Sequence, residues 1–442
     1  MKTRYTAFLA LALLMAPGSV GSLKAASPWT LEQSLEHALL HNPDALIARH
    51  RIASAQARLE QANSAFWPRV RLESGYTRTD NPMRVFGSIL NQRAYRSSLD
   101  FNDVPDVVAL NLRGLVTVPL YNGGRDRAAR RTARAEEEAS RQDHEAIRNA
   151  LGFEVSRAFH TVLKTRRFIE AVEAQVRAFE AHRDVARKRL DGGTLLKSDA
   201  LDIEVRLAGA REDLVRARNA RSLAERALRH LLGIEEGEFT VADRAPEARA
   251  PESGDFTQRP ELAAAREHAI AAEAQVRGAK SGYVPRVSAF SSLDYDYGWV
   301  TRGDGTSYSV GILAQWDVWD GFSTRSRARE AEAHLHAARE EQRQLRLALD
   351  FEVEQARLDY NEASERLEVG DRTVEQAAES ARLTGVRFEQ GLALATDLIE
   401  AEAALVAARV RRAEAEIDQR IAIAAWRKAL GWPQLDSRVS IE

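Results

Sequence analysis

The 442-residue chain contains no cysteine. This absence excludes disulfides, thiolate metal sites and cysteine nucleophiles, and also a lipid anchor on an N-terminal cysteine. The sequence also lacks a phosphate-binding glycine loop, a His-Glu-x-x-His motif and a glycine-flanked nucleophilic serine. His37 and His41 have the spacing of a metal-binding pair, but no third ligand accompanies them. We therefore expect no enzyme activity, no cofactor and no metal site.

Long hydrophobic runs are also scarce. After residue 26 no stretch approaches 18 apolar residues, so no membrane-spanning helix is predicted. The start of the chain has the features of a secretory signal, with Lys2 and Arg4 before the apolar residues 7–16. We predict a signal peptide over residues 1–26, with cleavage between Gly21 and Ala26. The protein is then exported, and it contacts a membrane through a β-barrel or by surface association.

No strong excess of charge of either sign is present. The chain has 63 basic and 65 acidic residues, and loss of residues 1–26 removes three basic residues and no acids, changing the net charge from −2 to −5. Nucleic-acid binding requires a concentrated basic face, so we expect no nucleic-acid partner. With 44% apolar and 29% charged residues, the chain is expected to be folded and is not a polytopic helical membrane protein.

The chain is internally duplicated. Pro-Arg-Val occurs at Pro68 and again 217 residues later at Pro285, whereas Gly123 and Gly321 are 198 residues apart. The difference of 19 residues falls between residues 70 and 120, so the two halves differ in one loop. We predict a first repeat over 27–233, a linker or equatorial segment over 234–257, a second repeat over 258–432 and a tail over 433–442.

Long helices dominate both repeats. Apolar residues recur at steps of three and four, which predicts helices over 124–190, 194–232, 322–388 and 393–430. The longest of these helices would extend about 100 Å at 1.5 Å per residue. A shorter helix of roughly 25 residues precedes each Pro-Arg-Val, and stacked on the returning helix it would match the long one. A solvated antiparallel coiled-coil bundle is the alternative interpretation of the helices alone.

Two segments of each repeat alternate apolar and polar residues. They predict strands at about 68–80, 108–121, 285–297 and 308–319, and most tryptophans and tyrosines lie in or beside them. Four strands cannot close a barrel, and the eight strands of a dimer would be filled by their own side chains. Three chains would supply twelve strands and an open lumen. A face of a soluble β-sandwich is the alternative.

In this order and in duplicate, the motifs resemble those of the TolC-like outer-membrane efflux (outer-membrane factor) family. They are Phe66-Trp67-Pro68, Tyr283-Val284-Pro285, Tyr121-Asn122-Gly123-Gly124, Trp319-Asp320-Gly321, Arg387-Phe388-x-x-Gly391, Asp397-Leu398-Ile399-x-Ala401 and Arg427-x-Ala429-Leu430-Gly431. The resemblance implies an α+β membrane channel, with a long helical coiled-coil barrel and four strands per chain in a shared twelve-stranded trimeric β-barrel. It also implies a small mixed domain around residues 233–257 and the chain ends.

The same resemblance implies a function and partners. The chain would be a homotrimeric exit duct in the outer membrane of a Gram-negative bacterium, with a large periplasmic portion and contact with outer-membrane lipid. It would serve a tripartite efflux pump or a type I secretion system, with a periplasmic adaptor (membrane fusion) protein and an inner-membrane transporter of RND, MFS or ABC type. Small molecules, ions and polypeptides are cargoes of such ducts. The alternative is a periplasmic coiled-coil adaptor or scaffold without a pore.

The resemblance further implies site residues. The periplasmic aperture would be lined by the acids Asp397 and Glu400, with Asp199 and Asp202 at the equivalent positions and Phe388 nearby. Three copies would form acidic rings that favour cations. Acids that simply complement the dipole of a helix start are the alternative. Ala393 stands where some relatives carry a basic residue that holds the aperture shut.

The two glycine turns and the two prolines complete the expected sites. The turns would form the periplasmic tip and contact the adaptor through Gly192, Gly193, Leu195, Gly391 and Leu394. Pro68 and Pro285 would mark the transitions from helix to strand.

Overall fold

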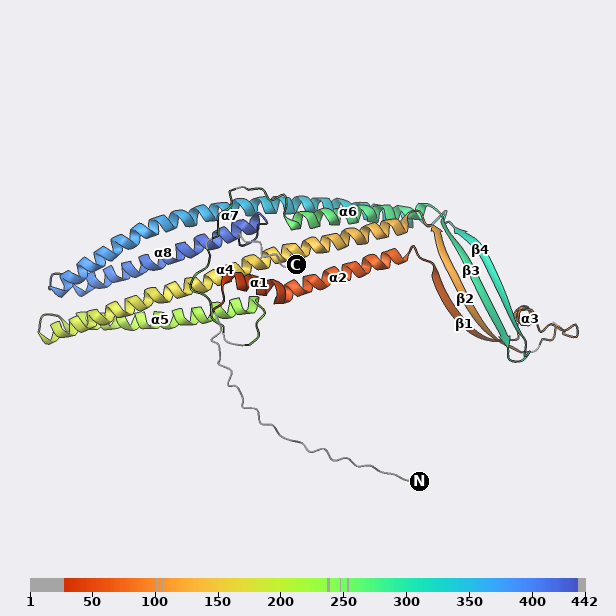
Figure 1. Ribbon diagram of the computed structural model, residues 1–442, viewed down its shortest axis with the longest axis horizontal. Helices are drawn as coiled ribbons and strands as arrows, with labels where there is room; N and C mark the ends of the chain where they lie inside the picture. The colour runs from red at the N-terminus through yellow and green to blue at the C-terminus, as the bar shows by residue number, and fades with distance from the viewer. Residues whose placement is uncertain are drawn as a thin grey trace, which may run out of the picture.

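The computed structural model describes residues 28–100, 102–104, 106–236, 239–246, 248–252 and 254–435. The predicted signal peptide at residues 1–26 and residues 436–442 of the predicted tail lie outside the described residues. The described chain is long and narrow (Figure 1). Two helical hairpins point to one end, and a sheet occupies the other.

The duplication is visible in the helices. The first repeat holds α1 (Leu31–His41), α2 (Pro43–Ser64), α4 (Arg125–Asp191) and α5 (Lys197–Leu231). The second holds α6 (Pro260–Lys280), the short helix η1 (Ser281–Tyr283), α7 (Ser323–Glu389) and α8 (Ala395–Ala429). Both α4 and α7 have 67 residues and both α5 and α8 have 35, so the repeats build matching hairpins.

The returning helices stack end to end on the short helices, as the helix lengths predict. Asn42 caps the start of α2, and its Nδ2 donates a hydrogen bond of 2.8 Å to the carbonyl oxygen of Leu231 at the end of α5. In the second repeat Nη1 of Arg259 donates at 3.2 Å to the carbonyl oxygen of Ala429 at the end of α8. Leu231 and Ala429 are 198 residues apart, so different side chains make the same junction in both repeats.

The strands are β1 (Arg69–Thr79), β2 (Val107–Tyr121), β3 (Arg286–Gly298) and β4 (Asp304–Gln315), and they form one antiparallel sheet in the order β1-β2-β3-β4. The expected fourth strand at about 308–319 is displaced, because β4 begins and ends about four residues earlier. Its last residue, Gln315, pairs with Arg286, the first residue of β3. Pro285 precedes Arg286 and has no backbone N–H to extend the ladder.

The segment that differs between the repeats, predicted as a loop, contains a helix, α3 (Pro82–Asn91). Asn81 caps it by accepting a hydrogen bond from the backbone N–H of Arg84 at 3.2 Å. Its apolar face buries Val85 and Ile89 against Val107 of β2. A single buried face on a ten-residue helix is too short a pattern to stand out from loop in the sequence.

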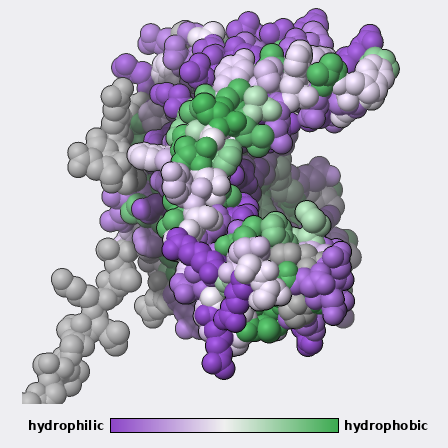
Figure 2. Space-filling view, turned by 90° about the vertical axis from the view of Figure 1, so that its right-hand side faces the viewer, coloured by the Kyte–Doolittle hydropathy of each residue, from purple (hydrophilic) through white to green (hydrophobic). Residues whose placement is uncertain are grey.

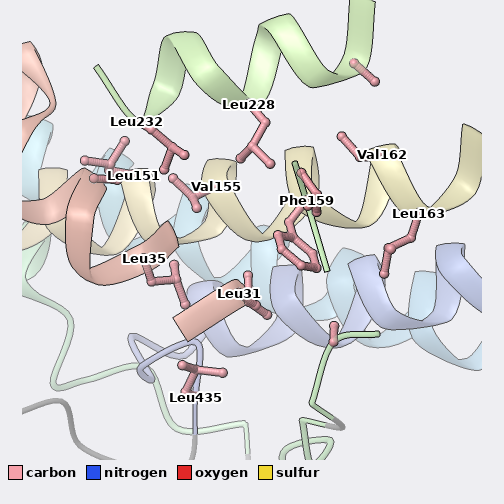
Figure 3. Packing of buried hydrophobic residues seen from close by; sticks show 14 of the residues in the cluster. Leu31, Leu35, Leu151, Val155, Phe159, Val162, Leu163, Leu228, Leu232 and Leu435 are labelled. Carbon is pink, nitrogen blue, oxygen red and sulfur yellow. The ribbon is translucent and has the colours of Figure 1, made fainter. Parts of the chain in front are cut away.

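The main core lies where α1 crosses the middle of α4. Figure 3 shows Leu31 and Leu35 of α1 beside Val155 and Phe159 of α4, with Leu228 of α5 on the opposite side. Trp29 joins the segment 239–246 to this core, since its backbone N–H donates to the carbonyl oxygen of Thr240 at 2.8 Å. The start of the described chain and the segment between the repeats thus form a small additional layer beside the hairpins.

Candidate functional site

The sheet has one apolar and one polar face. Directly opposed residues of neighbouring strands point to the same side, and Leu72, Leu293 and Tyr308 lie in one such row. All three side chains are largely exposed. Hydrophobic patches separated by hydrophilic residues are also visible from the sheet end of the molecule (Figure 2). An exposed apolar sheet face on a chain of this composition is suited to lipid.

The opposite face carries paired charges. Glu73, Arg113 and Asp294 form a row across β1, β2 and β3. Nε of Arg113 donates to Oδ1 of Asp294 at 2.6 Å, and Nδ2 of Asn111 donates to Asp296 at 3.0 Å. Asp294 and Asp296 are buried among these partners, and a polar face of this kind belongs on the water-filled side of a membrane sheet.

Pro68 and Pro285 lie where the sequence places them, between helix and strand. Pro68 follows α2 and precedes β1, and Pro285 separates η1 from β3. Close packing accompanies this transition: a Cβ on Gly123, which has a φ of +66°, would lie 2.2 Å from Cγ2 of Val284. The return from strand to helix therefore requires glycine at position 123.

The two turns at the far end of the hairpins have the same backbone structure. Gly193 and Gly391 have φ values of +69° and +80°, which favour glycine. The N–H of Thr194 donates to the carbonyl oxygen of Arg189 at 2.8 Å, and Leu392 makes the same bond to Arg387. Gly192 has an ordinary φ of −80°. Each long helix thus ends in a glycine-dependent cap.

The exposed leucines of the turns differ in part from those expected. Leu394 is exposed, but Leu195 is partly buried against the core of the tip. The exposed leucine of the first turn is Leu196, which lies 198 residues before Leu394. Leu392 is exposed as well. The repeat offset already identifies Leu196, whereas burial of Leu195 depends on the helices around it.

Phe388 is fully buried rather than exposed at an opening. It packs with Phe179, Ile203 and Leu398 in a cluster that joins both hairpins. The guanidinium of Arg189 lies over its ring, 5.1 Å from the centroid, and Nη1 of Arg189 donates to the Phe388 carbonyl oxygen at 2.7 Å. Arg189 therefore fastens one hairpin to the other.

The four predicted aperture acids lie just past the turns. Asp397, Glu400 and Asp202 are exposed, and Asp199 is half-buried. Asp397 accepts a hydrogen bond from the backbone N–H of Leu394 at 3.1 Å, so it caps the start of α8. Capping occupies one carboxylate oxygen and leaves the charge exposed.

Within the described ranges, no three or more His, Cys, Asp or Glu residues are grouped so that they could hold a metal ion. His37 and His41 stack on each other, with ring centroids 4.1 Å apart. No helix of the described chain is both long and apolar enough to cross a membrane.

The comparisons with known proteins identify the family. The sequence matches the outer membrane efflux protein family at residues 34–234 and 256–432. A search of curated protein sequences gave no match. Among solved structures, the outer-membrane channel OprN superposes with a TM-score of 0.80 at 23% identity, covering 91% of this chain and 90% of that one.

Two further outer-membrane proteins have the same fold. VceC of Vibrio cholerae has a TM-score of 0.78 at 19% identity, with 91% of this chain and 96% of that chain covered. The CmeC channel of Campylobacter jejuni has a TM-score of 0.74 at 16% identity, with 92% and 87% covered. The family match favours the duct over the alternative of a scaffold without a pore. The chain belongs to the outer membrane efflux protein family, a family of transport ducts and not of enzymes, and it is an outer-membrane exit duct for tripartite efflux with a large periplasmic portion.

Proposed function

We propose that three copies of this chain form one continuous duct and that the duct docks onto a periplasmic adaptor at its hairpin tips. One observation carries the trimer: equivalent positions of the two repeats differ sharply in exposure. Ile399 of α8 is 7% exposed, whereas Leu201, its equivalent on α5, is 49% exposed. Ala171 of α4 is 8% exposed, whereas Val369 on α7 is 62% exposed.

The difference follows from which helices meet. Among the described residues α4 packs along α8, but α7 has no comparable packing against α5. Because the repeats are equivalent, α7 of one copy can pack on α5 of the next as α4 packs on α8. That contact would cover Leu201 and Val369, whose exposure costs free energy in the single chain. Repetition of one such contact around an axis closes a ring.

Charges at the same positions are complementary. Within the chain, Nζ of Lys164 lies 3.8 Å from Oε1 of Glu414. The residues 198 positions away are Glu362 on α7 and Arg216 on α5. The acid and the base have exchanged positions, but the two residues still carry opposite charges. We therefore assign Glu362 and Arg216 of neighbouring copies to the same contact.

The sheet supports the same assembly. Among the described residues, β1 and β4 each pair with one strand only. Open strand edges are not tolerated in lipid, because their backbone groups would lack hydrogen bonds. Pairing β4 of one copy with β1 of the next would give twelve strands in a trimer, enough for an open lumen.

At the other end, exposed leucines support an adaptor site. Leu196, Leu392 and Leu394 project from the turns, and apolar side chains at a tip are suited to a protein partner. The adaptor would link the duct to an inner-membrane transporter. Asp397 and Glu400 would narrow the lumen just above the tips, with Asp199 and Asp202 in the alternate helices.

Crosslinking tests the trimer contact. Because the chain has no cysteine, Arg216→Cys with Glu362→Cys introduces the only two thiols. A short bis-maleimide should convert the detergent-solubilised protein into covalent dimers and trimers. Lys164→Cys with Glu414→Cys is the matched control and should crosslink only within one chain. Monomers after crosslinking of the first variant, or a native mass other than three copies, would refute the proposed assembly.

Photocrosslinking tests the adaptor contact separately. A photoreactive residue at Leu196 or Leu394 should trap a periplasmic protein in cells, whereas the same probe at the half-buried Leu195 should trap much less. Labelling of the tip probes by reagents added outside the cell would show that the tips face the exterior, which would contradict this part of the proposal.

A further inference from the structure

A stripe of arginines near the sheet has no ion-pair partner. Arg127, Arg130, Arg131 and Arg134 are spaced i, i+3, i+4 and i+7 and therefore share one face of α4. All four side chains are exposed, and among the described residues none of them forms an ion pair. By contrast, Arg141, one heptad further on, is paired and lies 2.6 Å from Glu137.

The arginine stripe, as we call these four residues, lines a groove of about 1010 Å³. Its walls come from α2 and α6 and include the apolar side chains of Leu59 and Ile270. Glu137, Glu138 and Glu267 also line it, so its charge is mixed. Glu137 is paired with Arg141, and Glu138 accepts from Gln142 at 2.9 Å. The groove offers four guanidinium groups without ion-pair partners beside an apolar surface.

The stripe faces the outside of the tube. Four heptads, or 28 residues, separate Arg127 from Val155, Arg131 from Phe159 and Arg134 from Val162. Residues separated by whole heptads lie on the same face of a supercoiled helix. Val155, Phe159 and Val162 form the core beneath α1 and the segment at Val241. An extra layer inside a duct would block the lumen, so it lies on the outer surface. The arginine stripe is on the same face, nearer the sheet.

The stripe is also at the level of the membrane boundary. Arg127 follows the end of β2 at Tyr121 by six residues, and Arg134 lies about 10 Å further along the helix. Arg130 lies over the ring of Phe66, 4.8 Å from its centroid, and the neighbouring Trp67 is exposed. Tryptophan and other aromatic side chains beside basic residues are typical of the headgroup region.

We propose that the arginine stripe binds the anionic phosphate headgroups of lipids in the periplasmic leaflet of the outer membrane. This inference rests on insertion of the sheet in the membrane as part of the proposed trimer. Guanidinium groups bind phosphate oxygens through paired hydrogen bonds, and the apolar groove wall accepts the start of an acyl chain. Three copies would place twelve arginines around the tube, which would fix its depth in the membrane.

Native mass spectrometry of the purified trimer tests the inference. The probes are phosphatidylglycerol, which is anionic, and phosphatidylcholine, which has no net charge, each added in detergent. We expect the parent trimer to retain phosphatidylglycerol preferentially. Arg127→Gln with Arg131→Gln and Arg134→Gln should weaken that retention by roughly fivefold for each arginine removed, since one basic residue near a lipid surface contributes about that factor.

A matched control removes equal charge elsewhere. Arg343→Gln, Arg372→Gln and Arg382→Gln lie on α7 and should leave the preference unchanged. An excess of inorganic phosphate should compete poorly if the acyl chain contributes; efficient competition would identify a free-phosphate site instead. Equal retention of the two lipids by the parent would overturn the inference. So would an unchanged preference for phosphatidylglycerol in the variant that lacks three arginines of the stripe. Either result would point to an acidic protein segment as the occupant. Retention is scored on the trimer peak, so absence of that peak contradicts the trimer and not the lipid site.

Discussion

Nη1 of Arg189 donates a hydrogen bond of 2.7 Å to the carbonyl oxygen of Phe388, which ties the first hairpin to the second within one chain. The equivalent arginine, Arg387, is exposed, and its side chain makes no hydrogen bond or ion pair in the described part of the chain. In the proposed trimer, Arg387 would donate to the carbonyl oxygen of Leu190, the equivalent of Phe388, in the next copy. Three bonds from Arg189 and three from Arg387 would then hold the tips of the trimer in a ring.

The first prediction concerns these ties. Arg387→Ala should loosen the tip much as Arg189→Ala does, because each removes from the trimer three hydrogen bonds that tie one hairpin to another. Each such bond has a charged donor and is worth roughly 1.5–3 kcal/mol. Single-channel conductance in planar bilayers should rise for both variants. Arg382→Ala, an exposed arginine paired on its own helix, is the control and should leave the conductance unchanged. If Arg387→Ala keeps the parent conductance while Arg189→Ala does not, the hydrogen bond between neighbouring copies is absent and only the one within the chain exists.

The second prediction concerns the aperture acids. The parent channel should conduct cations preferentially and be blocked by trivalent cations from the periplasmic side, because three or six carboxylates would surround a narrow axis. Asp397→Asn with Glu400→Gln should abolish the block. Asn keeps an acceptor for the Leu394 N–H, so the helix start should survive. Glu340→Gln with Glu341→Gln, two exposed acids of α7 far from the turns, should remain blocked. Persistent block in the first variant would leave Asp397 and Glu400 as ordinary helix-start acids.

The third prediction concerns the apolar sheet face. Leu72→Arg places a charge on that face and should destabilise the inserted sheet by about 2–4 kcal/mol near the bilayer midplane. Its neighbour Glu73 points to the polar face, so Glu73→Arg should be tolerated far better. The measurement is the amount of folded, heat-modifiable protein in outer-membrane fractions. Equal loss for both variants would contradict the assignment of the two faces.

The fourth prediction concerns acid stability. His160 is 4% exposed, and its Nδ1 has no hydrogen-bond partner. Burial, aided by the positive charge of Arg420, lowers the pKa of His160 to about 4. The unfolded chain takes up a proton near pH 6.5, whereas the folded chain does so only near pH 4. The free energy of unfolding should therefore fall as the pH drops from 6.5 to 4, by about 3 kcal/mol per chain.

His160→Leu should remove this dependence, and leucine is the residue at the equivalent position 358. The drop in melting temperature between pH 7 and pH 5 should be smaller in this variant than in the parent. The exposed His268 supplies the control, since His268→Leu should keep the parent's drop. An unchanged drop in His160→Leu would show that other groups cause the acid sensitivity.

Patterns of neighbouring residues were sufficient for most of the fold. Steps of three and four define the long helices, and glycine defines both turns, because helix formation and capping depend on residues a few positions apart. Alternation defines the four strands, and Pro68 and Pro285 mark where two of them begin. The end of β4 was misplaced because it depends on a partner strand, whose pairing stops at Arg286.

The sequence by itself therefore determined the duplication, the long helices, the presence of four strands and the family. Tertiary structure alone decided which side chains of the tip are covered, since Phe388 and Leu195 turn inward. It also decided that Arg189 reaches the second hairpin and that four arginines remain unpaired beside the sheet. The reason is physical, since the side of a helix that is covered depends on helices distant in sequence that pack against it.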